Sequence, residues 1–180
     1  MSLKDFDKPF HVGKGNLNVV ICINQNLGQA RKSPINQMLE DVQLELKKEL
    51  PSYEAIHVAF VYETPLLNVK LFEILTEETP VYYKEPCEYS ETHNMKQLFF
   101  MGLVLLEKQQ KVVVGESRFY LLTDERFSRV HINEIVQNSR FSNLKFKPVL
   151  YTNQPKDEKD LLVQYFNKYG DVREFFSDTK

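Results

Sequence analysis

The sequence predicts an α/β fold, a doubly wound and mostly parallel central sheet with one antiparallel edge strand and helices on both faces. Apolar, β-branched runs of strand length alternate along the chain with segments of helical periodicity. The first of these runs, residues 19–23, is apolar without interruption, which is typical of a strand covered on both faces. We expect one domain over residues 17–176, an N-terminal segment over residues 1–16 and a polar tail over residues 177–180.

The first half of the chain predicts a central strand, a helix and two further strands. After the strand at residues 19–23, apolar side chains recur at helical spacing from Ile35 to Leu50 and predict an amphipathic helix, with Pro34 near its start and Pro51 ending it. Two strands are expected at residues 56–62 and 69–75. The connection between them is too short for a helical crossover, so the second of them should be an antiparallel edge strand.

The second half predicts a buried helix followed by alternating strands and helices. Residues 95–110 keep helical spacing and are apolar nearly all round, which indicates a deeply packed helix. Gly170 could take a left-handed cap at the end of the last helix. The remaining elements are expected at residues 118–123 (strand), 133–139 (short helix), 146–151 (strand), 155–169 (helix) and 171–176 (edge strand).

Composition and charge exclude several classes of function. The chain has 23 Lys and Arg against 25 Asp and Glu, so its net charge of -2 provides no broad attraction for nucleic acid or anionic lipid. It has no apolar run long enough to span a membrane, and its 2 cysteines are too few for a disulfide framework. We therefore expect a soluble, cytoplasmic protein that binds neither nucleic acid nor membranes.

Three polar segments are predicted to meet at the carboxyl edge of the sheet. Residues 24–28 follow the first strand, residues 90–94 precede the buried helix, and residues 124–125 follow the strand at residues 118–123. Ligands of open α/β sheets bind at this edge. The edge is therefore the expected binding surface.

In this order and spacing, roughly over residues 17–176, the sequence resembles a von Willebrand factor type A (vWA) domain. Members of that family show an apolar strand ending in Asp-x-Ser-x-Ser, a loop Thr before a buried helix, and an apolar strand ending in Thr-Asp-Gly. The resemblance implies a Rossmann-like fold and a metal-ion-dependent adhesion site that usually holds Mg²⁺. Thr92 and Asp124 match the family's pattern.

The first motif departs from the family and predicts a degenerate adhesion site. Asn24 replaces its Asp and removes a negative charge, Asn26 replaces the first Ser, and Gly28 replaces the second Ser and removes a hydroxyl without supplying another side-chain ligand. Mg²⁺ needs oxygen ligands and negative charge to offset its dehydration. We expect no resident cofactor. The alternative is a Mg²⁺ ion on Thr92 and Asp124 with Asn24 or Asn26.

Two neighbouring residues could replace missing metal ligands. Glu125 stands where the family has Gly, and His93 follows Thr92. The simpler interpretation is structural: the Asn and Gly residues form a polar turn, the Thr caps a helix, and the Asp accepts backbone hydrogen bonds. Either arrangement leaves these loops available to a partner.

Tyrosines among charged residues precede this loop, in the segment at residues 82–89. A tyrosine ring offers a partner contact area at low entropic cost and a hydroxyl for hydrogen bonding. Alternatively, these rings lie on the domain's own core. The candidate partner-binding residues are Asn24, Asn26, Gly28, Tyr83, Tyr89, Thr92, His93, Asp124 and Glu125.

The favoured interpretation is a non-enzymatic module that binds another protein, as the resemblance implies. The first alternative is a vWA domain that binds its ligand through a divalent metal. The second is a small Rossmann-like enzyme with a perturbed Cys87, His93 or Asp124 in a closed pocket. Against it, the sequence has no Walker A motif, and its only Gly-x-Gly precedes the first strand instead of following it.

Overall fold

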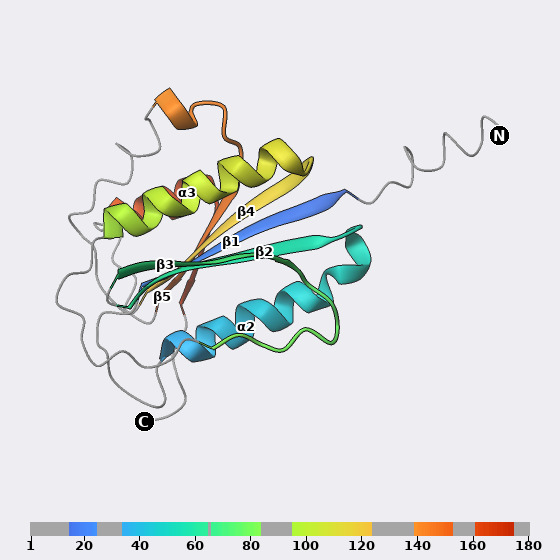
Figure 1. The fold of residues 1–180 in the computed structure, drawn as a ribbon. Helices are drawn as coiled ribbons and strands as arrows, with labels where there is room; N and C mark the ends of the chain where they lie inside the picture. The colour runs from blue at the N-terminus through green and yellow to red at the C-terminus, as the bar shows by residue number, and fades with distance from the viewer. Residues whose placement is uncertain are drawn as a thin grey trace.

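The fold is an α/β sheet covered by helices on both faces (Figure 1). A computed structural model describes residues 15–24, 34–64, 66–83, 95–123, 139–152 and 161–174. Within these residues, the strands form one sheet in the order β3-β2-β1-β4-β5-β6. They are β1 (Asn16–Asn24), β2 (Ile56–Thr64), β3 (Leu66–Ile74), β4 (Gly115–Thr123), β5 (Lys147–Thr152) and β6 (Asp171–Glu174).

Helices cover the two faces of this sheet unequally. The described helices are α2 (Pro34–Lys48), α3 (Met95–Val112) and α5 (Leu161–Tyr169), with short 3-10 helices η1 (Leu50–Ser52) and η2 (Ser139–Phe141). Figure 1 shows α2 on one face and α3 on the other, and α5 packs in the same core cluster as α3. All strand pairs are parallel except β2 with β3. The predicted fold class is confirmed.

β1 lies at the centre of the sheet because both of its faces are apolar. Leu17, Val19, Ile21 and Ile23 belong to the core under α2. Val20 and Cys22 point the opposite way, into the core under α3, because successive strand side chains alternate between faces. All residues from Leu17 to Asn24 are buried.

α2 packs on the sheet through one apolar stripe and adds polar contacts beyond it. The stripe consists of Ile35, Met38, Leu39, Val42 and Leu46, all fully buried. The helix ends at Lys48, two residues before the predicted end, because Leu50 and Pro51 form the 3-10 helix η1. Beside the stripe, Arg118 of β4 pairs with Glu49 at 2.7 Å, and Arg173 of β6 pairs with Glu45. These ion pairs connect α2, and the residue directly after it, to the central strand β4 and to the edge strand β6.

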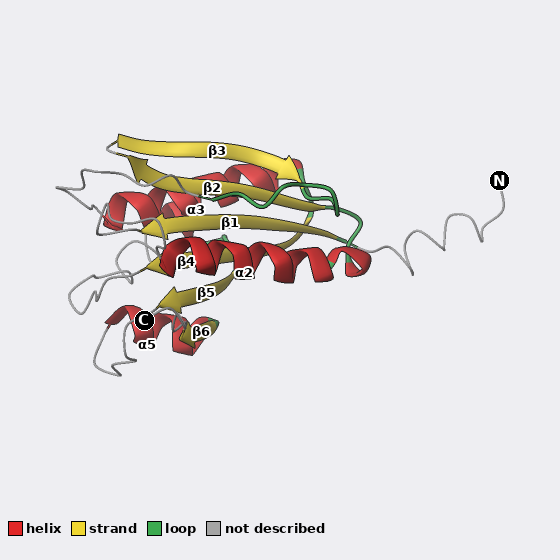
Figure 2. Cartoon of the chain, turned by 90° about the horizontal axis from the view of Figure 1, so that it is seen from below, coloured by secondary structure: helices red, strands yellow, loops and turns green. Residues whose placement is uncertain are grey.

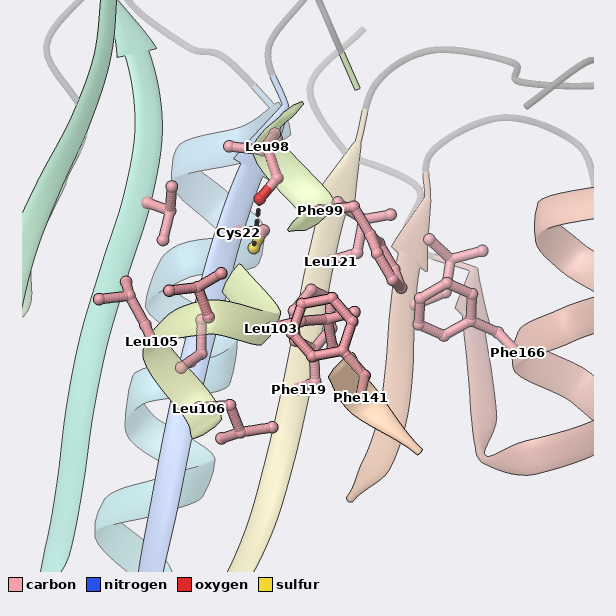
Figure 3. Close-up of a cluster of buried hydrophobic side chains, with 14 of the residues drawn as sticks. Cys22, Leu98, Phe99, Leu103, Leu105, Leu106, Phe119, Leu121, Phe141 and Phe166 are labelled. Atoms are coloured by element: carbon pink, nitrogen blue, oxygen red, sulfur yellow. Dashed lines mark hydrogen bonds between the residues drawn. The ribbon is translucent and has the colours of Figure 1, made fainter. Parts of the chain in front are cut away.

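α3 approaches the sheet closely at Gly102. A Cβ atom there would lie 2.5 Å from the Cys22 sulfur and 2.6 Å from the Phe119 ring. The Cys22 thiol donates a hydrogen bond to the Leu98 carbonyl at 3.7 Å (Figure 3). Burial raises the pKa of this thiol well above its usual value. Cys22 is therefore a core residue, as its place in an apolar strand indicates.

The ends of the sheet agree with the predicted edge strands. β3 pairs antiparallel with β2 at one edge, and β6 pairs parallel with β5 at the other.

Gly170, at the end of α5, is not in the left-handed conformation expected of it. Glycine is needed there because a Cβ atom would lie 1.7 Å from the Pro148 carbonyl oxygen. The predicted helix at residues 133–139 lies outside the described residues, apart from Ser139.

Replacing Gly102 with alanine should destabilise the fold by about 1–3 kcal/mol, because the added methyl group overpacks the contact with Cys22 and Phe119. Alanine would otherwise favour the helix by about 1 kcal/mol. Urea unfolding measures the free energy of unfolding, with Lys108→Ala on the exposed face of α3 as the control. A Gly102→Ala chain as stable as the wild type would contradict this packing.

Stability should fall at alkaline pH through Tyr165. Burial, and then the neighbouring Tyr169, raises the pKa of Tyr165 to about 12. The unfolded tyrosine ionises near pH 10, so the stability that Tyr165 contributes is complete below about pH 10 and is lost as the pH rises towards about 12. Tyr165→Phe keeps the ring and should lose less stability than the wild type over that interval. If the unfolding free energies of the wild type and Tyr165→Phe fell equally with pH, the raised pKa of Tyr165 would not be the cause of the loss.

Candidate functional site

Three strands end side by side in buried polar residues at the carboxyl edge. Asn24 of β1 pairs in register with Thr123 of β4, which pairs with Thr152 of β5. Their exposed fractions are 2%, 1% and 5%. Each lies two residues after a strand residue of the core under α3, and strand residues two apart point to the same face. All three side chains therefore lie on the α3 face. We call this set the polar row.

The amide of Asn24 is a hydrogen-bond donor within the polar row. Its Nδ2 donates to the Thr123 hydroxyl oxygen at 2.9 Å. An ionised carboxylate at this position could accept a hydrogen bond but could not donate one. Asn24 therefore joins the ends of β1 and β4 through a neutral amide, whereas an Asp would have to accept from the Thr123 hydroxyl and would place a charge in a buried position.

Most of the other sequence-predicted site residues belong to segments that the structure does not describe. Those that lie outside the described residues are Asn26, Gly28, Cys87, Tyr89, Thr92, His93, Asp124 and Glu125. β4 ends at Thr123 and α3 begins at Met95, so Asp124 and Thr92 are one and three residues from described elements. Sequence reasoning missed Thr123 and Thr152 as site residues. A signal was present, because both strands end in two apolar residues followed by Thr.

Residues 75–83, which we call the strap, run from the end of β3 alongside α2 (Figure 1). The Gln43 side chain binds the strap at two points: its Nε2 donates to the Tyr82 carbonyl, and its Oε1 accepts from the Tyr82 amide, both at 2.7 Å. The Lys47 ammonium donates to the carbonyls of Glu77 and Thr79, at 3.2 and 2.5 Å. These contacts fix the strap to α2.

The two tyrosines of the strap have different environments. Tyr82 packs on the core, with its ring centre 4.6 Å from that of Phe60 and 6.2 Å from that of Tyr62. Tyr83 is 47% exposed and hydrogen-bonds to Glu40. Since Tyr62 pairs with Ile23, one residue before Asn24, the strap ends near the carboxyl edge. Tyr83 is therefore the exposed tyrosine of the strap.

A cavity of about 20 Å³ lies beneath the strap, between α2, β2 and β3. Its lining includes Lys70 and Glu73, 3.7 Å apart, and the Tyr82 ring. A volume of this size holds about one water molecule. The contact between the strap and the sheet is therefore close-packed and leaves no room for a substrate.

Neither a metal cluster nor a membrane span is found in the described part of the chain. Among those residues, no group of three or more His, Cys, Asp or Glu side chains could hold a metal ion. None of the helices described has the length and apolar character that a bilayer crossing requires.

The strand order, the helices on both faces and the polar carboxyl edge define a doubly wound α/β domain. A comparison with solved structures finds the crystal structure of the ArnB paralog VWA2 from Sulfolobus acidocaldarius, with a TM-score of 0.50 and 11% sequence identity. The match covers 91% of this chain and 42% of that chain. This chain therefore spans less than half of that protein's length.

No family model and no curated protein sequence matches the chain. At 11% identity, the likeness to VWA2 concerns the fold alone. The vWA-like fold that the sequence resemblance implies is confirmed by this likeness. A degenerate adhesion site stays a prediction.

Replacing Asn24 with Asp should destabilise the chain by about 1–3 kcal/mol at neutral pH, because a buried carboxylate replaces a hydrogen-bond donor. Burial raises the pKa of the introduced carboxyl in the folded state, so the loss should shrink as the pH falls through that pKa. Urea unfolding at about pH 7 and about pH 5 measures the difference. Asn143→Asp, in an exposed turn, is the matched control. Equal stability of the two variants would contradict the structural role of Asn24.

Proposed function

We propose that this chain is a non-enzymatic module that binds another protein through the loops at its carboxyl edge, without a metal ion. The observation that carries the proposal is the buried hydrogen bond from Asn24 to Thr123. By the vWA resemblance, this is the position of the first metal-binding carboxylate. Here it holds a neutral amide that donates into the sheet.

The charge at the motif positions supports binding without a metal. A hard divalent cation is held by several oxygen ligands whose negative charge offsets its dehydration. Of the positions whose side chains hold the metal in the family, only Asp124 carries a carboxylate, and Gly28 has no side-chain ligand. Glu125 stands at the Gly position of the motif, which supplies no side-chain ligand in the family. A partner would therefore meet polar loops and not a cation.

The strap supports a role in protein recognition because it holds an aromatic side chain in place beside the edge. Gln43 fixes the backbone at Tyr82, and the next residue, Tyr83, is nearly half exposed. A contact residue ordered before binding loses less conformational entropy when a partner docks. We propose that Tyr83 and the edge loops together form the partner-binding surface.

Capture of a partner from the native cells tests this function. The full chain should retain the same bound protein in Mg²⁺ and in EDTA. A Tyr83→Ala, Asp124→Ala variant should lose it, because both changes remove side chains from the proposed surface. Lys108→Ala, on the exposed side of α3, is the control and should retain the partner.

Two outcomes would contradict the proposal. Loss of the partner in EDTA, restored by Mg²⁺, would support metal-dependent binding instead. Retention of the partner by the double variant would show that the protein binds elsewhere. Circular dichroism of each variant confirms that the fold is intact.

A further inference from the structure

The outer face of α2 carries an exposed apolar residue between charges of opposite sign. Leu44 is 42% exposed, although it lies in the middle of a helix whose other large aliphatic residues are buried. Glu40 and Asp41 precede it, and Lys47 and Lys48 follow it. Residues three and four apart lie on the same side of a helix, so these five residues form one surface. We call it the outer face of α2.

The charged positions on the outer face are symmetric about Leu44, and the two sides carry opposite signs. The two acids stand four and three residues before it, and the two lysines stand three and four residues after it. If a second α2 helix runs in the opposite direction with its Leu44 opposite the first, each acidic pair faces a lysine pair. The outer face is thus complementary to a second copy of itself.

Three of these charges are held in place by contacts at the edges of the outer face. Glu40 accepts a hydrogen bond from the Tyr83 hydroxyl. The Lys47 ammonium binds carbonyls of the strap, and an Asp41 carboxylate oxygen lies 3.1 Å from the Tyr151 hydroxyl. Two further acids, Glu45 of α2 and Glu49 just after the helix, are paired with arginines of the sheet. These contacts hold the charged side chains in fixed positions on α2.

The outer face is open to a partner. An open hollow on α2 is lined by Asp41, Leu44, Glu45, Lys47, Lys48 and Glu77. In Figure 2, which views the sheet from the α2 side, α2 lies in front of the strands and no described segment crosses it. Among the described residues, this side of α2 is thus uncovered.

We propose that the outer face of α2 is a self-association surface, which binds a second copy of this chain with the two α2 helices antiparallel. A two-fold axis beside the paired Leu44 side chains relates the copies. Such an isologous contact closes on itself and gives a dimer. Leu44 packs on Leu44 at the centre, and the acidic pair of each copy faces the lysine pair of the other.

The expected dimer is weak and sensitive to salt. One pair of helices forms an interface below the roughly 1,000 Å² that stable complexes bury. The charge pairs remain partly exposed, so each contributes little and salt screens it. Association should therefore be reversible and strongest at low ionic strength.

The arrangement has a geometric consequence for partner binding. α2 follows the end of β1 and lies along the strands (Figure 2), so its first turn is nearer the carboxyl edge than its last. Antiparallel pairing directs the two carboxyl edges to opposite ends of the dimer. The dimer would offer two such edges facing in opposite directions, with Tyr83 beside the contact because it hydrogen-bonds to Glu40.

Analytical ultracentrifugation of the full chain at low salt tests the proposal. The wild type should show a concentration-dependent monomer–dimer equilibrium, with a dissociation constant below about 1 mM. Leu44→Asp should weaken dimerisation at least about tenfold, because it places two carboxylates at the centre of the contact. Lys108→Glu, a charge change on α3, is the control and should leave it unchanged. Thermal unfolding verifies that the variants fold.

Charge exchange tests the antiparallel arrangement itself. Glu40→Lys and Lys48→Glu each remove the attraction at both ends of their own dimer, so each variant alone should associate more weakly than the wild type. A mixture of the two variants restores an acidic pair opposite a lysine pair at one end. The mixture should therefore associate more strongly than either variant by itself.

Each contrary result overturns the proposal. A wild type that stays monomeric at about 1 mM would contradict self-association, even if another protein were found to bind the outer face. So would a dimer that Leu44→Asp leaves intact, because it must use another surface. A mixture of Glu40→Lys and Lys48→Glu that associates no better than its components would exclude antiparallel pairing of the helices.

Discussion

The burial of β1 from both faces is the constraint on which the other layers of this fold depend. A strand in the middle of a mostly parallel sheet cannot turn one face to water, so helices must cover both sides. Val19 and Ile21 require α2, while Val20 and Cys22 require α3. α3 approaches β1 so closely at Gly102 that there is no room for a side chain there.

The same burial extends to the end of β1 and determines what the carboxyl edge can do. Asn24 is enclosed like the apolar residues before it, and its amide is satisfied within the sheet by Thr123. A buried polar group is costly unless it is hydrogen-bonded. Asn24, which the vWA resemblance places at a metal-ligand position, thus donates a hydrogen bond within the sheet. Under the proposed function, the surrounding loops and Tyr83 bind the partner.

Much of the fold could be predicted because it follows local patterns. The uninterrupted apolar run of β1, the all-round apolar character of α3 and the short connection before β3 each had one reasonable structural interpretation. The strap could not be predicted, because residues 75–83 have no periodicity and are held by tertiary contacts from Gln43 and Lys47. The reason for a glycine at residue 170 was predicted wrongly as a left-handed helix cap. Glycine is needed because of the close Pro148 carbonyl, which comes from another element. At the candidate site, the motif made Asn24 a predicted site residue, but its hydrogen bond to Thr123 depends on the register between two strands and could not be predicted.

Titration of the full chain with Mg²⁺ and Mn²⁺ by isothermal calorimetry is the most direct test of the central claim, that the carboxyl edge works without a metal ion. The account predicts no saturable binding by the wild type, because Asn24 supplies a hydrogen-bond donor where a metal site needs a carboxylate. Saturable binding that is abolished by Asp124→Ala would contradict it.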